Sequence, residues 1–445
     1  MTVCAGLATI ATAISALLFT GCKENGYQKS VYIPKDLQRM NLDDTASLYC
    51  YQRSVSTPDI ILFWEKGFGP DVSKASDYKG HKMTVDPGNL LAQSQYFYDY
   101  FRDTLVFIRQ GSKADSIKMM IMLRYDDDGT AYGGDYDETI GALWVTPLRT
   151  RDEKMNCIAH ELGHSFQSQL SIDNNSGFSS GGIYEMTSQW MLWQVNPNWV
   201  DDEKYHWDAF MSQTHLAFMH PDNMYHSPYV LEYWSEKYGK AFIADLWRSA
   251  SKRHDVIQVY EDMQGIDDTA FGAEMLDAAL HFMAYDMPRI HNVMTGYANR
   301  HTSTLQPADR DGWQQIAPER VPQQYGYNGI ALEVPAPGQT VNVRLKGNFP
   351  PGQRLYAQSE EYVRQAAWSF GLAGVDRDGV CHYSETEVST IGHDAEISFR
   401  SPAAISLEYL WLVVVPTPHK HADVLEENAS DYINYPYSVR ITVTP

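Results

Sequence analysis

The pentapeptide His160-Glu161-Leu162-Gly163-His164 constrains this chain more than any other segment does. Histidines four positions apart on an α-helix lie one turn apart on the same face, and two such imidazoles can bind one Zn²⁺ ion. Apolar residues recur at helical spacing around the pentapeptide, and Thr150-Arg151-Asp152-Glu153 predicts a capping box at the start of the helix. Glu161 lies about 100° around the helix axis from His160. Its carboxylate can therefore take a proton from a water molecule beside the metal.

A catalytic zinc ion needs a third protein ligand and an open fourth position. The glycine-rich link 177–182 leads into residues 183–190, where apolar side chains recur at helical spacing and an acidic residue, Glu185, stands near the start. Glu185 follows His164 by 21 residues. We predict Glu185 as the third ligand, with Asp173 and His206 as alternatives.

These residues resemble the motif of gluzincin metallopeptidases, in which a Glu from the next helix completes two His ligands. The segment HELGHSFQ is similar to that of enhancin-type, mucin-targeting gluzincins, and the whole layout is similar to uncharacterised secreted metallopeptidases of gut Bacteroidetes. The resemblance covers roughly residues 140–249. The metzincin arrangement is excluded, because Gln167 and Leu170 stand where it needs a glycine and a histidine. Gln189 departs from the gluzincin pattern, which usually has Asp, Ser or Ala one turn after the ligand.

The resemblance implies a zincin-like catalytic domain, Zn²⁺ as the cofactor, and Glu161 as the general base of peptide-bond hydrolysis. It also implies a Tyr or His that donates a hydrogen bond to the oxyanion of the intermediate. Tyr225, His226 and Tyr229 are the candidates in the expected region, and we favour Tyr229. The expected substrates are extracytoplasmic proteins, peptides or glycoproteins.

Several segments upstream have recognisable patterns. Residues 60–64 and 117–124 predict buried strands, and residues 90–105 predict a helix. The acidic, glycine-rich segment 126–138 predicts a solvated loop, with a calcium site as the alternative. Ile140–Val145 predicts a short edge strand on which an extended substrate would lie.

The character of the chain changes near residue 325. Residues 153–284 are mainly helical in pattern, whereas short β-rich segments separated by Pro and Gly follow after residue 325. We predict an α+β fold in which a zincin-like, gluzincin-type metallopeptidase domain, residues 31–325, is followed by a C-terminal β-sandwich, residues 326–445.

The first residues resemble a bacterial lipoprotein signal. A short apolar stretch ends in Phe19-Thr20-Gly21-Cys22, which is similar to a lipobox. We expect a signal peptide over residues 1–21, a lipid on Cys22, and a tether over residues 22–30. The protein would then be anchored in the bacterial cell envelope, with the outer membrane as the expected site. Three further cysteines, at positions 50, 157 and 381, allow one disulfide at most.

The net charge limits the classes of partner that the protein can bind. A formal net charge of −21 repels phosphate backbones and anionic headgroups, so we expect no nucleic-acid partner and membrane contact through the lipid anchor only.

Two functions fit the sequence. One is a zinc peptidase; the alternative is a surface lipoprotein that binds glycans or proteins on a zincin scaffold without catalysis. Glu161 favours the enzyme, because a structural zinc site is usually closed by four protein ligands.

Overall fold

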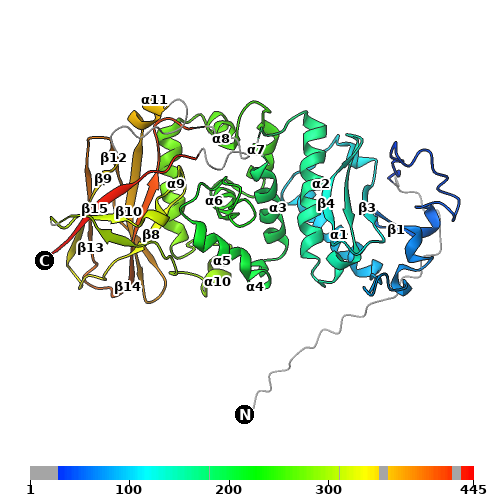
Figure 1. Ribbon diagram of the computed structural model, residues 1–445, viewed down its shortest axis with the longest axis horizontal. Coiled ribbons are helices and arrows are strands. Elements are labelled where there is room, and N and C mark those ends of the chain that lie inside the picture. Colours follow the sequence, from blue (N-terminus) through cyan, green and yellow to red (C-terminus); the bar gives the residue numbers. More distant parts are fainter. Residues whose placement is uncertain (1–28, 180, 310, 350–358, 423–431) are drawn as a thin grey trace, which may run out of the picture.

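Two β-sheet bodies lie at opposite ends of the molecule, with a layer of helices between them (Figure 1). The computed structural model describes residues 29–445 apart from residues 180, 310, 350–358 and 423–431. The predicted signal peptide, residues 1–21, and the predicted lipidation site, Cys22, lie outside the described residues. The mixture of helices and sheets agrees with the predicted α+β class at this coarse level.

The N-terminal sheet has its strands in the order β1-β2-β3-β5-β4. The strands are β1 (Ser54–Ser56), β2 (Ile60–Trp64), β3 (Met119–Leu123), β4 (Ala131–Tyr136) and β5 (Ile140–Val145). β2, β3 and β5 run parallel, whereas β1 and β4 are antiparallel to their neighbours. Every residue of β2 and β3 is buried, as is usual for central parallel strands. Helices α1 (Pro87–Asp103) and α2 (Asn156–Asn174) pack against each other and against this sheet.

The edge of this sheet beside α2 is β4, so the prediction that Ile140–Val145 forms the edge is wrong. That segment is a strand, β5, but it lies between β3 and β4. The acidic segment 126–138, predicted to be a loop, supplies β4 and the turn that follows it. Asp137 and Glu138 have positive φ angles of 53° and 52° and close β4 onto β5 as a hairpin. Glycine is depleted in strands, which is why this segment was predicted as a loop.

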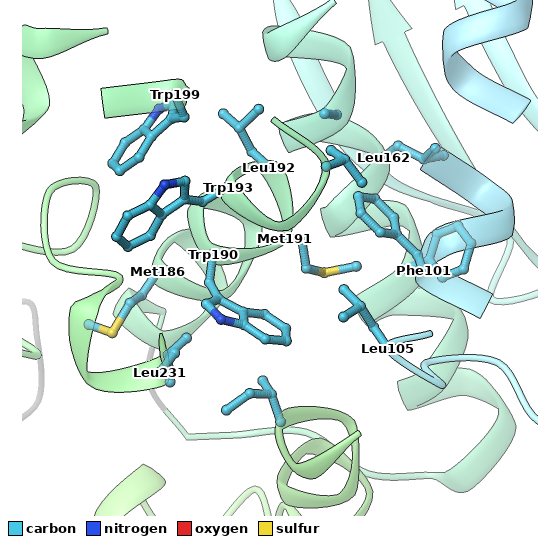
Figure 2. Packing of buried hydrophobic residues seen from close by; sticks show 14 of the residues in the cluster. Phe101, Leu105, Leu162, Met186, Trp190, Met191, Leu192, Trp193, Trp199 and Leu231 are labelled. Atoms are coloured by element: carbon cyan, nitrogen blue, oxygen red, sulfur yellow. The ribbon is translucent and has the colours of Figure 1, made fainter. Parts of the chain in front are cut away.

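The middle layer is helical, as the sequence predicted. Its helices are α3 (Gly182–Val195), α4 (Trp199–Asp202), α5 (Lys204–Gln213), α6 (Tyr229–Tyr238), α7 (Phe242–Ser249), α8 (Val256–Gln264), α9 (Asp268–Phe282) and α10 (His291–Met294). Every residue of α3 except Tyr184 and Glu185 is buried. Figure 2 shows Trp190 and Trp193 of α3 within this core. Because α3 has neighbours on all sides, its position is fixed by packing.

The C-terminal body, as far as the structure describes it, is a β-sandwich of two five-stranded sheets. One sheet has the order β11-β10-β14-β8, with β12 also paired to β10, and the other has the order β13-β9-β15-β7-β6. The two sheets share a core that includes Val343, Phe370, Leu412 and Val439. The elements are β6 (Leu305–Pro307), β7 (Gln314–Ile316), β8 (Asn328–Ala331), β9 (Thr340–Gly347), α11 (Ser359–Arg364), β10 (Ala367–Asp376), β11 (Cys381–Tyr383), β12 (Glu387–Thr390), β13 (Ala395–Arg400), β14 (Leu407–Pro416) and β15 (Tyr437–Thr444).

The sandwich starts earlier than predicted and is joined to the helices by a common core. β6 and β7 precede the expected boundary between residues 325 and 326, yet they extend the sheet that contains β15. Each has only three residues, too few for a recognisable alternation. Helix α9 packs on β10 and β14, and Val413 and Val415 of β14 belong to the same hydrophobic cluster as the helical layer.

Two further findings concern membrane spans and the cysteines. Within the described part of the chain, no helix is both long and apolar enough to cross a bilayer. Cys50, Cys157 and Cys381 are free thiols, so none of them forms the disulfide that the sequence allowed.

Candidate metal centre

The histidine helix is present as predicted, but the predicted capping box does not open it. Helix α2 begins at Asn156, and its N-cap residue, Met155, has a left-handed φ of 55° without a side-chain cap. Thr150 belongs to a short 3-10 turn before the helix. Asp152 serves the helix instead, because its carboxylate accepts a hydrogen bond from the Asn156 N–H at 3.0 Å.

Two helices bring three ligand atoms together. The Nε2 atoms of His160 and His164 on α2 lie 3.2 Å apart, and each lies 3.1 Å from Oε2 of Glu185 on α3. Ligands of one tetrahedral zinc ion at about 2.0–2.1 Å would be about 3.3–3.4 Å apart. The nearly equilateral triangle therefore fits a zinc ion. The predicted ligand Glu185 lies in the group, whereas Asp173 and His206 do not.

Two glutamines determine which imidazole nitrogens face the triangle. The Gln189 amide donates to the Tyr225 carbonyl at 3.1 Å, which turns its Oε1 toward Nδ1 of His160 at 2.7 Å. The Gln167 amide donates to the Tyr184 carbonyl at 2.9 Å and turns its Oε1 toward Nδ1 of His164 at 3.1 Å.

An amide oxygen can only accept, so each Nδ1 carries the proton and each Nε2 presents a lone pair. Such partners fix the tautomer and the orientation of a metal-binding histidine.

The triangle consequently attracts positive charge. Burial disfavours ionisation of Glu185, yet the two adjacent imidazoles hold the pKa of its carboxyl well below the usual range. Burial also disfavours the charged form of His164, but the carboxylates of Glu185 and Glu161 raise its pKa. Three acceptor atoms this close repel one another unless a cation lies among them.

Two glycines allow the close approach of the elements that carry these residues. A Cβ at Gly163 would lie 2.8 Å from Oγ of Ser188, so only glycine lets α2 and α3 come this close. A Cβ at Gly133 would lie 2.0 Å from the carbonyl oxygen of Glu161, so β4 touches α2 directly. Glycine is expected where two backbones must come this near.

A cavity of about 550 Å³ opens over the triangle. Its walls come from β4, α2 and α3, together with Tyr225 from the segment before α6. Glu161 lines it, and its carboxylate lies within 4.8 Å of the histidine ligand atoms. A metal ion held by the triangle would thus have an open side facing Glu161. Among the described residues the acidic segment 126–138 forms no comparable group of ligand atoms.

Tyr229, the favoured oxyanion donor, is in the wrong place for that role. Its side chain is fully buried and packs against Trp193 and Phe210. It does not line the metal cavity, whereas Tyr225 does, with its ring stacked 6.2 Å from that of His160. Tyr229 lies four residues further on, as the first residue of α6, where this helix enters the core. Burial and the nearby carboxylate of Glu185 raise the pKa of Tyr225, which keeps its hydroxyl protonated.

The other candidate residues, His206, His226 and Asp173, lie outside the triangle of ligand atoms. His206 accepts a hydrogen bond from the Gln189 amide at 3.2 Å, and its Nδ1 lies 2.6 Å from Nδ1 of His226. Burial, together with His206, lowers the pKa of His226 to about 4, so the His226 ring is a neutral packing partner near pH 7. Asp173, near the end of α2, accepts from Gln169. Sequence reasoning missed Gln167, whose spacing of three from His164 on one helix was the available signal.

The orientation of His160 by Gln189 leads to a direct test. We expect Gln189→Leu to weaken the affinity of the protein for added Zn²⁺ by about 10- to 100-fold, because the amide oxygen that fixes the tautomer is lost. Competition with a chromophoric chelator measures this affinity. Gln306→Leu is the control, because Gln306 is exposed on β6 in the C-terminal body, away from the metal centre. Equal zinc affinities for the two variants would contradict the assigned role of Gln189.

Comparison with known proteins places the chain in a family. No curated protein matches it. A solved xylan-binding domain from CBM 22 matches at 11% identity over 32% of this chain and 79% of the domain, with a TM-score of 0.19. The C-terminal family 22 carbohydrate-binding module of Clostridium thermocellum Xyn10B matches at 11% over 32% and 78%, also with a TM-score of 0.19. Both TM-scores are too low to indicate a shared fold. Residues 23–445 match the sequence family described as "Family of unknown function (DUF6055)", and the chain therefore belongs to this family.

Proposed function

We propose that the protein is a zinc-dependent peptidase of the gluzincin type, with zinc held by His160, His164 and Glu185. The observation that supports this most strongly is the triangle of acceptor atoms, with sides of 3.1–3.2 Å and an open side toward Glu161. A structural zinc site would need a fourth protein ligand and would have no use for a carboxylate beside an open position.

The surrounding fold is consistent with a zincin-like domain. A mixed sheet lies behind the histidine helix, its outermost strand runs beside that helix, and the next helix supplies the third ligand. Only β5 pairs with β4 within the described sheet, so the outer edge of β4 can pair with an extended peptide. Such pairing would place a backbone carbonyl of the peptide over the cavity.

The residues around the cavity have distinct roles in the proposed hydrolysis. When bound, zinc would polarise the scissile carbonyl and activate the attacking water. Glu161 accepts the proton of that water and passes it to the leaving amine. Tyr225 keeps its proton and donates a hydrogen bond to the oxygen on which charge develops. Gln167 and Gln189 hold the imidazoles in the orientation that this arrangement requires.

The decisive variant is Glu161→Gln. It keeps the size of the side chain and leaves the three ligands untouched, so zinc content and melting temperature should stay as in the wild type. Loss of a general base typically costs about 10² to 10⁴ in rate. The measurement is hydrolysis of a broad peptide and glycopeptide library by zinc-loaded protein.

Glu153→Gln is the control, because Glu153 is exposed in the turn before α2. If wild-type protein with bound zinc cleaves nothing in the library, the peptidase proposal fails. A lipoprotein that binds glycans or proteins through the same scaffold then takes its place.

The two tyrosines can be separated by removing one hydroxyl at a time. We expect Tyr225→Phe to lower kcat by about 10² to 10³, because an oxyanion donor is lost. Tyr229→Phe should leave kcat unchanged, since its hydroxyl is buried without a hydrogen-bond partner among the described residues. The opposite pattern would restore Tyr229 to the role that the sequence favoured.

We also propose that the protein is anchored in the bacterial cell envelope through a lipid on Cys22. The proposal rests on the sequence Phe19-Thr20-Gly21-Cys22 alone. Mass spectrometry of the mature N-terminus from a native host should find a diacylated cysteine as the first residue. A mature protein cleaved elsewhere, without lipid, would refute it.

A further inference from the structure

The edge strand β4 carries one largely exposed aromatic side chain beside the metal cavity. Tyr132 lines that cavity and is 61 % exposed. Its ring contacts the ring of Trp144, its cross-strand partner on β5, with 5.6 Å between the centroids. Trp144 is held in turn by Tyr136, whose hydroxyl accepts from the indole N–H at 3.1 Å. The Tyr132 ring therefore has a fixed partner on the sheet, and most of its surface remains in contact with solvent.

The neighbouring glycine determines how this ring lies. A Cβ at Gly134 would lie 3.3 Å from Oη and 3.4 Å from Cε1 of Tyr132. Residues two apart on a strand point to the same face of the sheet. The Tyr132 ring thus leans along β4 into the space above Gly134 and covers backbone that no other side chain of the strand protects.

Tyr132 is the side chain of this face that a paired peptide can reach. The neighbouring Gly133 faces α2, so Tyr132, Gly134 and Tyr136 face the other way. Gly134 has no side chain, and Tyr136 is only 8 % exposed. A peptide that extends the sheet at β4 has one residue directly opposite Tyr132, with its side chain on the same face and the Cβ atoms about 4.5–5.5 Å apart. Contact with Tyr132 follows from the pairing itself.

The chemistry of this face favours an apolar partner. Neither strand places a charged side chain on it, since its residues are Tyr132, Gly134 and Tyr136 of β4 and Ile140, Ala142 and Trp144 of β5. The exposed ring can remove a large apolar side chain from water, and an aromatic one can also pack against its edge or face. A charged side chain would lose water there without meeting an opposite charge on this face.

We propose that Tyr132 selects substrates with an aromatic or large aliphatic side chain at the residue that pairs with it. Trp144, Tyr132 and that side chain would then form one row of cross-strand contacts over three strands. On the face toward α2, Gly133 provides no side chain, so β4 selects by side chain on one face only. The inference rests on the proposed function, because the pairing of a peptide with β4 over the metal cavity defines which residue meets Tyr132.

Peptide hydroxamates test this selectivity without a known substrate, because the hydroxamate binds zinc directly and fixes the register. The probes are alanine peptides with the hydroxamate at either the C-terminus or the N-terminus, so that both sides of the metal are sampled. A single Phe replaces Ala at each of the first few positions in turn. At one position, Phe should strengthen binding to the zinc-loaded full chain by about five- to tenfold over Ala.

Three variants assign this gain to the ring. Tyr132→Ala should abolish it, whereas Tyr132→Phe should keep it, because the ring and not the hydroxyl makes the contact. Zinc affinity and melting temperature should stay as in the wild type, since Tyr132 is largely exposed and is not a metal ligand. Tyr96→Ala is the control and should keep the gain, because Tyr96 is 50 % exposed on α1 and does not line the metal cavity.

The outcomes separate this inference from the proposed function. If the hydroxamates bind but Phe gives no gain at any position, or the gain survives in Tyr132→Ala, the selectivity is refuted and the peptidase proposal stands. A gain that depends on Tyr132 for Lys and not for Phe would mean that the ring binds cations, and would also refute it. If no hydroxamate binds the zinc-loaded protein, the peptidase proposal fails and this inference fails with it.

Discussion

The crossing of α2 and α3 is the contact on which the rest of the site depends. Two ligands lie on one helix and the third on the other, so a small shift between the helices would open the triangle of His160, His164 and Glu185. Gly163 allows the crossing, since any Cβ there would meet Ser188. The position of α3 is set from its far side as well, where the buried carboxylate of Glu232 accepts from Trp190 and Gln194 of α3 and pairs with Arg289. The helical core thus holds α3, and with it Glu185, in place through contacts other than those with α2.

A second glycine joins β4 closely to α2. Gly133 brings the edge strand into contact with the backbone of Glu161, so the surface that would align a peptide and the carboxylate that would accept a proton belong to one rigid unit. A second cavity, which shares Asp135, Ser168 and Tyr184 with the metal cavity, continues along α2.

Much of the site could be predicted from sequence because its signals are local. The spacing of His160 and His164 predicts that both imidazoles share one helix face, and the gluzincin resemblance pointed to Glu185 on the next helix; the structure brings these three side chains together. Tyr229 was favoured wrongly because the apolar pattern of α6 does not show that its first residue, four positions after Tyr225, already lies in the core. The edge strand and the early start of the sandwich were missed for a different reason. Both depend on pairing with distant strands, and short or glycine-rich segments carry no periodic pattern of their own.

The central claim is that two imidazoles and one carboxylate hold a zinc ion with an open position. X-ray absorption spectroscopy at the zinc edge, on protein loaded with one equivalent of Zn²⁺, measures this coordination directly. We expect two imidazole nitrogens at about 2.0–2.1 Å and two oxygen ligands at about 2.0–2.2 Å, one from Glu185 and one from solvent. In Glu185→Ala, solvent fills the vacated position, so both imidazoles should remain while the affinity for zinc falls. A zinc shell with three or more imidazoles, with a sulfur, or with undiminished affinity in Glu185→Ala would contradict it.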